Sequence, residues 1–132
     1  MTEETASTLG RILVVDDDPV ICRLLARVLR GRYAVTAVAQ ASQALRLFRP
    51  GQYSVALVDL GMRSLPGDRM ARQMRQIDPT VATILITGWE LEDDDPRRHA
   101  CDFYLHKPFG DLEELEATVA RAVELHQQRR GG

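Results

Sequence analysis

The sequence predicts an α/β fold, a doubly wound five-stranded parallel sheet with helices on both faces. Five short apolar runs alternate with segments whose apolar residues recur at helical spacing. The runs are continuously apolar, which indicates strands covered on both faces. Because the connections are short, one doubly wound domain is favoured over separate layers. The predicted strands are Ile12–Val15, Val35–Val38, Val55–Val58, Val81–Ile86 and Phe103–Leu105.

Four of the intervening segments have the apolar spacing of a helix that packs one face on a sheet. The first follows Pro19, with apolar residues on one side and arginines on the other. The second covers Ala41–Phe48 and the third covers Met70–Ile77. The last begins after Asp111, whose side chain is a suitable N-cap for the first turn.

The segment Trp89–Ala100 occupies the place of a fourth helix and is predicted to form only a short or displaced one. It has few apolar residues, and the consecutive acidic residues Glu92–Asp95 repel one another. Aspartate also has a low helix propensity away from a helix start. Pro96 would break a helix begun at Trp89, although it suits the first position of a short turn capped by Asp95.

Composition limits the class of protein. The 132 residues are 45% hydrophobic and 27% charged, which is typical of one globular domain. The formal net charge of -2 gives no basic field for direct binding to nucleic acid or anionic lipid. No apolar run reaches the roughly 18 residues of a membrane span, so a cytoplasmic protein without membrane contact is expected. Cys22 and Cys101 lack metal-ligand spacing and are expected to be free thiols.

One domain is expected over residues 11–127, because no internal repeat, linker or change of composition divides that stretch. A polar tail is expected at 1–10, and a flexible end is expected at 128–132.

Polar residues follow four of the five predicted strands at the point where each strand ends. In chain order they are Asp16 and Asp17 after the first strand, Asp59 after the third, Thr87 after the fourth and Lys107 after the fifth. Ligands of open α/β sheets bind beyond the carboxyl ends of the strands, where the strand order reverses. If the first and third strands are neighbours there, their carboxylates share one pocket.

Such a pocket has the chemistry of a phosphoryl site. Carboxylates held a few ångströms apart repel one another unless a cation joins them. A hard divalent ion with oxygen ligands, Mg²⁺, would relieve that repulsion. Lys107 adds a fixed positive charge, Thr87 adds a hydroxyl donor, and one carboxylate is placed as a nucleophile.

Four sequence blocks resemble the signature motifs of the response-regulator receiver family of bacterial two-component systems. They are ILVVDDDP, ALVDLGM, ILITG and DFYLHKPF, in the family's order and at closely similar spacing. The resemblance extends from about Arg11 to about His126 and implies the flavodoxin-like strand order 2-1-3-4-5. The loop after Asp59 departs from the family, because its sequence MRSLPGD displaces the usual proline and keeps the glycine.

The resemblance implies which residues take the phosphoryl group and the metal ion. Asp59 resembles the phosphoacceptor of the family. Asp16 and Asp17 resemble the acidic pair that binds Mg²⁺. Asp59 and the backbone carbonyl of Gly61 would complete the protein's ligands to that ion.

Three further residues resemble those that respond to the phosphoryl group. Lys107 resembles the lysine that contacts the phosphoryl oxygens, Thr87 the switch hydroxyl and Tyr104 the switch aromatic. Tyr104 could instead be a core residue with its hydroxyl at the edge. The Lys107–Pro108 bond is expected to be cis, an isomer that proline makes accessible. Trp89, the only tryptophan, is expected to line the mouth of the site.

By this resemblance the protein is a phosphorylation-activated signalling switch of a phosphorelay and not an enzyme that turns over a metabolite. Asp59 would accept a phosphoryl group from the phosphohistidine of a sensor histidine kinase or a histidine phosphotransfer protein. The changed surface would act on a downstream protein target or a fused output domain.

Two other functions fit parts of the pattern. A receiver-like docking module would work without phosphorylation, but the complete set of pocket residues argues against it. A flavin binder or a metal phosphohydrolase could use the same fold, yet no glycine-rich phosphate loop follows the first strand. Among single residues, Asp18 is expected to be a helix cap. The run Asp93–Asp95 is either a second cation site or, in the favoured interpretation, a solvated loop.

Overall fold

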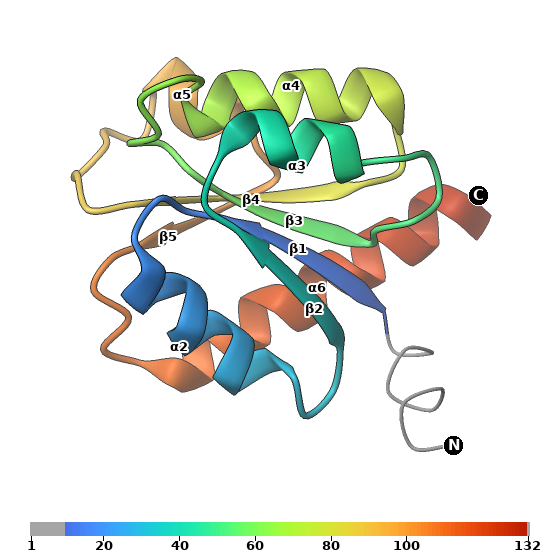
Figure 1. Cartoon of the computed structure of the whole chain (residues 1–132), viewed down its shortest axis with the longest axis horizontal. Helices are drawn as coiled ribbons and strands as arrows, with labels where there is room; N and C mark the ends of the chain where they lie inside the picture. The colour runs from blue at the N-terminus through green and yellow to red at the C-terminus, as the bar shows by residue number, and fades with distance from the viewer. Residues whose placement is uncertain (1–9, 132) are drawn as a thin grey trace.

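Five parallel strands form one sheet at the centre of the molecule (Figure 1). The computed structural model describes residues 10–131, so the polar tail expected at 1–10 lies, except for Gly10, outside the described residues. The strand order is β2-β1-β3-β4-β5, as the family resemblance implies. The strands are β1 (Arg11–Val15), β2 (Ala34–Val38), β3 (Val55–Asp59), β4 (Ala82–Thr87) and β5 (Phe103–His106).

Helices cover both faces of the sheet, with α3, α4 and α5 on one face and α2 and α6 on the other (Figure 1). They are α2 (Pro19–Leu29), α3 (Ala41–Leu47), α4 (Gly67–Ile77), α5 (Pro96–His99) and α6 (Leu112–Gly131). None of the helices within residues 10–131 has both the length and the apolar character needed to cross a membrane.

Each face of the sheet has its own hydrophobic core, which explains why the strand sequences are continuously apolar. In β1, Leu13 and Val15 pack on the side of α3 and α4, whereas Ile12 and Val14 pack on the side of α2 and α6. All four side chains are fully buried. The central strands β3 and β4 are buried along their whole length.

Two helix starts are capped by the aspartates that the sequence predicts. Asp18 Oδ1 accepts a hydrogen bond from the Val20 N–H at 2.9 Å at the start of α2. Asp111 Oδ1 accepts from the N–H groups of Glu113 and Glu114 at 3.0 and 3.2 Å at the start of α6. The Lys107–Pro108 peptide is cis, as expected.

The fourth helical segment, α5, is a single turn of four residues, so the prediction of a short helix is confirmed. Pro96 is its first residue, and Asp95 Oδ1 accepts from the Arg97 N–H at 2.9 Å. None of the residues of α5 is buried. The turn therefore contributes little to the core, which agrees with its lack of apolar residues.

The last helix is longer than the sequence analysis expected. It continues to Gly131, so residues 128–131 belong to α6, and the flexibility expected at 128–132 stays a prediction. Arg129 explains the difference, because its guanidinium contacts Asp102 Oδ1 at 2.6 Å and the Val81 carbonyl at 2.8 Å. The last turn of α6 is thereby tied to the start of β4 and β5.

Candidate functional site

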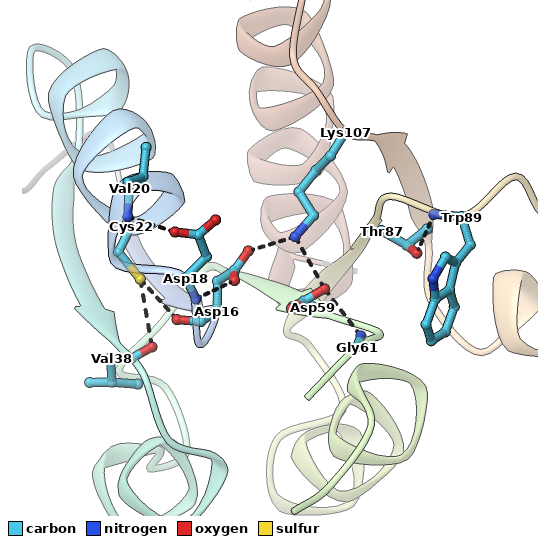
Figure 2. Close-up of polar contacts among 10 residues, drawn as sticks. All are labelled: Asp16, Asp18, Val20, Cys22, Val38, Asp59, Gly61, Thr87, Trp89 and Lys107. Carbon is cyan, nitrogen blue, oxygen red and sulfur yellow. Dashed lines mark hydrogen bonds and ion pairs between the residues drawn. The ribbon is translucent and has the colours of Figure 1, made fainter. Parts of the chain in front are cut away.

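The predicted polar residues converge at the carboxyl edge of the sheet (Figure 2). Asp16 and Asp17 follow β1, and Asp59 is the last residue of the neighbouring strand β3. Thr87 ends β4, and Lys107 follows β5 directly. Because all the strands are parallel, their carboxyl ends meet at one edge. The fold thus brings residues that are 91 positions apart, Asp16 and Lys107, into contact.

Two buried carboxylates share one lysine at this edge. Asp16 is fully buried and Asp59 is 4% exposed. Lys107 Nζ lies 3.1 Å from Asp16 Oδ2 and 3.4 Å from Asp59 Oδ1. Within residues 10–131 no other cation pairs with either carboxylate. The cluster therefore holds one more negative charge than positive charge before Asp17 is counted.

The pKa values in the cluster reflect burial first and the neighbouring charges second. Burial raises the pKa of Asp16 above its usual range, and the charge on Asp59 raises it further, against hydrogen bonds from Asp18 and Lys107. Burial lowers the pKa of Lys107, but the carboxylates of Asp59 and Asp16 outweigh it and raise the pKa overall. The lysine is thus firmly charged, while the ionised form of Asp16 is disfavoured.

The acidic cluster fits a divalent cation. Carboxylate oxygens of Asp16, Asp17 and Asp59 all lie within 4.8 Å of one another. Asp17 is exposed and the other two are buried, so the cluster has one side open to solvent. An all-oxygen set of carboxylates is what Mg²⁺ prefers, and its charge would offset the repulsion that raises the pKa of Asp16. The residues present therefore fit Mg²⁺.

Several backbone groups fix the orientation of the acids. The Gly61 N–H donates to Asp59 Oδ1 at 3.1 Å, and the Asp18 N–H donates to Asp16 Oδ1 at 2.9 Å. Cys22 Sγ lies 3.1 Å from the Asp16 carbonyl oxygen, to which its thiol donates. The role of Cys22 was not predicted, since a cysteine one turn into a helix gives no signal of a contact with the preceding loop.

Gly67 permits the close approach of α4 to the acceptor strand. A Cβ atom at this position would lie 2.6 Å from the Asp59 carbonyl oxygen and 2.7 Å from its carbon. Such distances do not occur in stable proteins, so only glycine fits without a shift of the backbone. The sequence analysis noted that the loop after Asp59 keeps a glycine, but it could not give the reason, which is lack of space and not turn geometry.

Thr87 and Tyr104 both bind the backbone of Trp89. The Trp89 N–H donates to Thr87 Oγ1 at 3.0 Å (Figure 2). The Tyr104 hydroxyl donates to the Trp89 carbonyl, also at 3.0 Å. Thr87 is buried beside the acids, whereas Tyr104 is half-buried and reaches the segment after β4. The predicted switch residues are therefore connected through one residue, Trp89.

The indole of Trp89 borders a groove next to the acids. The groove has a volume of about 610 Å³ and is lined by the loop after β3, including Gly61 and Met62, by the start of α4 and by Arg97. Trp89 is 55% exposed. Trp89 and Gly61 line the same groove, whereas the acids of the cluster do not line it, so the position of the indole at the mouth of the site stays a prediction.

Comparison with known proteins assigns the family. Residues 12–120 match the response regulator receiver domain. The chain belongs to this family. A receiver domain is a module of two-component signalling, and its acidic site is of the kind that binds Mg²⁺.

Among curated proteins, similar chains include two regulatory proteins of Escherichia coli strain K12, of which ZraR is a transcriptional regulatory protein. The regulatory protein ZraR is 31% identical over 116 residues, which are 85% of this chain and 26% of the relative. The regulatory protein AtoC is 32% identical over 129 residues, which are 94% of this chain and 27% of the relative. The chain thus spans about a quarter of the length of these relatives.

Solved structures of receiver domains are similar along nearly their whole length. The beryllofluoride-activated DrrB receiver domain is 26% identical with a TM-score of 0.79, and the match covers 87% of this chain and 97% of that one. The Thermotoga maritima regulator TrrA, solved with Mg²⁺ and beryllofluoride, is 30% identical with a TM-score of 0.75, over 85% and 97% of the two chains. TrrA has also been solved in complex with the histidine kinase ThkA.

Proposed function

We propose that this protein is a phosphorylation-activated switch of a two-component phosphorelay, with Asp59 as the phosphoacceptor. One observation carries the proposal most directly. Asp59 ends a buried strand beside Lys107 and two further carboxylates, so a nucleophile, a fixed cation and a metal-binding set of oxygens adjoin one another. This is the set of groups that transfer of a phosphoryl group to a carboxylate requires.

In the proposed reaction, Asp59 attacks the phosphorus of a phosphohistidine. A bond forms between a carboxylate oxygen and phosphorus while the P–N bond breaks, and the bonding electrons leave with the imidazole nitrogen. A proton on the other ring nitrogen leaves the departing imidazole neutral. Lys107, already 3.4 Å from Asp59 Oδ1, pairs with an oxygen of the incoming phosphoryl group. Asp16, Asp17, Asp59 and the Gly61 carbonyl would hold Mg²⁺, whose charge would offset the negative charge of the phosphoryl group.

The response to phosphorylation involves Thr87 and Tyr104. The Thr87 oxygen accepts the Trp89 N–H, so its own hydrogen is available to a phosphoryl oxygen. A shift of Thr87 toward that oxygen is passed to the Trp89 backbone and from there to the Tyr104 hydroxyl. The surface around α5 and β5 then changes.

The partners follow from this chemistry. A sensor histidine kinase or a histidine phosphotransfer protein supplies the phosphoryl group, in agreement with the solved complex of TrrA with a kinase. The output is a downstream protein target or a fused domain, which agrees with the chain matching 26% of the longer transcriptional regulatory protein ZraR. We place the receiver domain at residues 11–127, extended by the last turn of α6, and the protein in the cytoplasm.

Incubation with acetyl phosphate and Mg²⁺, followed by intact mass spectrometry, tests the proposal. The wild type should gain the mass of one phosphoryl group, and Asp59→Asn should gain none. Asp94→Asn, a matched change of an exposed aspartate, should gain the same mass as wild type. Labelling of Asp59→Asn to the wild-type extent would exclude Asp59 as the acceptor, and an unlabelled wild type would favour the docking module.

Two more variants separate the roles of the neighbouring residues. Asp17→Asn should raise the Mg²⁺ concentration needed for half-maximal labelling, because it removes an exposed ligand without disturbing the buried pair. Lys107→Ala should slow labelling at saturating Mg²⁺, because the phosphoryl oxygens lose their fixed cation. If both variants changed only the Mg²⁺ requirement, the proposed contact between Lys107 and the phosphoryl group would be wrong.

A further inference from the structure

Arg98, in the one-turn helix α5, contacts an aromatic ring, a backbone carbonyl and a carboxylate. Its guanidinium carbon lies 4.5 Å from the centre of the Tyr104 ring. One nitrogen of the same group donates to the Leu91 carbonyl at 3.2 Å and to Asp93 Oδ1 at 3.0 Å. Its side chain is 32% exposed, against 46% for its neighbour Arg97. Arg98 thus links the segment after β4 to the face of the tyrosine ring.

The Tyr104 ring is the middle of a chain of contacts that ends at the phosphoacceptor site. Its hydroxyl donates to the Trp89 carbonyl at 3.0 Å. The N–H of the same Trp89 donates to Thr87 Oγ1 at 3.0 Å, and Thr87 lies at the edge where the acids converge (Figure 2). Each link in the order Arg98, Tyr104, Trp89, Thr87 is a direct contact. A displacement of Arg98 can therefore alter the hydrogen bond at Thr87.

Side chains have to hold this segment because the helix does not. None of the four residues of α5 is buried, and in a helix of one turn no i to i−4 ladder fixes the preceding loop. Arginine suits the task, since its planar group stacks on an aromatic face and keeps its edge nitrogens free to donate. The shortened helix and the stacked arginine are thus two parts of one arrangement.

We propose that Arg98 is a positioning residue that holds the Tyr104 ring against the Trp89 backbone and thereby keeps the Trp89 N–H bonded to Thr87 Oγ1 before phosphorylation, which leaves the Thr87 hydroxyl hydrogen available to a phosphoryl oxygen. The inference rests on the proposed function and assigns a regulatory part to a residue outside the acidic pocket. Without Arg98, the Tyr104 ring is no longer held in place, and the hydrogen bond from its hydroxyl to the Trp89 carbonyl breaks more often. Binding of a phosphoryl group must then select a smaller population of correctly arranged molecules.

Beryllofluoride with Mg²⁺ is the probe, because it mimics the phosphoryl group and the single tryptophan reports next to the site. Arg98→Ala should weaken the apparent affinity for beryllofluoride by roughly three- to tenfold, the range that a partly buried cation–π contact allows. Arg98→Lys keeps the charge without the planar stacking group and should lose roughly half of that effect on a logarithmic scale. Arg97→Ala is the matched control, because within residues 10–131 the ion pair of Arg97 is with Asp95 and the guanidinium stacked on Tyr104 is that of Arg98.

Hydrogen exchange gives a second readout that requires no phosphoryl mimic. The Trp89 amide is bonded to Thr87, so its exchange should become several-fold faster in Arg98→Ala and stay unchanged in Arg97→Ala. Amides of the buried strand β4 should keep their wild-type rates in both variants, which separates a local effect from a loss of fold. Wild-type exchange at Trp89 in Arg98→Ala would overturn the proposal.

A double-mutant cycle with Tyr104→Leu decides whether Arg98 acts through the ring. If it does, Arg98→Ala should have little further effect on beryllofluoride affinity in the Tyr104→Leu background. An undiminished effect in that background would exclude the proposed route. A wild type that binds no beryllofluoride would instead contradict the proposed function, whereas a binding wild type with an unaffected Arg98→Ala would refute the positioning role alone.

Discussion

The two edges of the sheet hold buried or half-buried carboxylates in opposite electrostatic situations. At the carboxyl edge, Asp16 and Asp59 share the single cation of Lys107, and burial raises the pKa of Asp16. At the amino edge, Asp78 and Asp102 each accept several hydrogen bonds, and the pKa of each is lowered. The ionised form of aspartate is therefore disfavoured at the carboxyl edge, at Asp16, and favoured at the amino edge, at Asp78 and Asp102.

The bonds at the amino edge explain the lowered values. Asp102 accepts from the Thr83 N–H at 2.9 Å and from both terminal nitrogens of Arg129, at 2.6 and 3.1 Å. Burial alone would raise the pKa of Asp102, but Arg129 and Thr83 outweigh it. Asp78 accepts from the Gly51 N–H at 2.7 Å and from the Thr80 hydroxyl at 2.6 Å. For Asp78 too, these bonds outweigh burial.

The difference separates carboxylates that stabilise the fold from carboxylates that are kept available for chemistry. An acid whose pKa is lowered favours the folded state when it is ionised. An acid whose pKa is raised opposes folding when it is ionised, and the binding of a cation can offset that cost. The amino edge thus stabilises the sheet whose carboxyl edge carries the unbalanced charge.

The largest expected effect on stability is at the amino edge. Asp102→Ala should lower the free energy of unfolding by about 3 kcal/mol, because it leaves Arg129 and the Thr83 N–H without their partner in a half-buried site. Urea unfolding followed by circular dichroism measures the loss. Asp94→Ala removes an exposed aspartate and should leave the midpoint unchanged. Equal midpoints for the two variants would contradict the stabilising role of the Asp102 cluster.

A steric change at the other edge comes next in size. Gly67→Ala should lower the free energy of unfolding by about 2 kcal/mol, the usual cost of overpacking, because its Cβ would lie 2.6 Å from the Asp59 carbonyl oxygen. It should also slow labelling by acetyl phosphate, since α4 and the end of β3 must move apart. Gly110→Ala is the control, with no atom within 4 Å of the added carbon. Similar labelling rates in both variants would show that the close packing at Gly67 is not needed by the acceptor.

Much of the carboxyl edge could be predicted from the sequence because it follows from strand ends. Asp16 and Asp59 come directly after apolar runs, Lys107 follows a third run with only His106 between, and parallel strands bring their carboxyl ends to one edge. The short α5 was also predictable, because a run of acids followed by Pro96 has a purely local effect. Patterns of this kind need no knowledge of distant contacts.

The amino edge could not be predicted for the opposite reason. Asp102 and Arg129 are 27 residues apart, and neither stands at a position that periodicity marks as special. Arg129 lies in a polar, glycine-ended sequence that resembles a frayed end, so its contact with β4 and β5 was missed. The reason for Gly67 was missed as well, because free space around a Cβ atom is a property of packing alone.

A smaller effect on the unfolding free energy is expected when Mg²⁺ binds at the carboxyl edge. At a Mg²⁺ concentration ten times its dissociation constant, the wild type should gain about 1.4 kcal/mol in unfolding free energy. Asp59→Asn should gain much less, and in the presence of a chelator it should be more stable than wild type by about 1 kcal/mol, since it relieves the repulsion on Asp16. Trp89 fluorescence should follow the same Mg²⁺ titration. A wild type indifferent to Mg²⁺ would mean that the acidic cluster does not bind the ion.

The smallest expected effect is a pH dependence of opposite sign at the two edges. Asp16→Asn and Asp102→Asn are each compared with wild type in Mg²⁺-free buffer, and the difference in unfolding free energy is followed from pH 7 downward. Folding stability rises with pH wherever the unfolded state binds more protons than the folded state. For Asp102 the folded pKa lies below the usual 3.8, so its contribution is complete above 3.8 and is lost as the pH falls through the folded value.

For Asp16 the folded pKa lies above 3.8, so the folded state binds the proton first and the sign reverses. Its contribution is most favourable below 3.8 and is lost as the pH rises through the folded value, which leaves a penalty at neutral pH. The unfolding free energy of the wild type should therefore rise relative to that of Asp16→Asn as the pH falls toward 3.8. Relative to that of Asp102→Asn, it should fall only below pH 3.8. Saturating Mg²⁺ should flatten the first curve, because the bound ion holds Asp16 ionised, and should leave the second unchanged. Two difference curves that bend in the same direction would show that the carboxylates of both edges serve the fold in the same way.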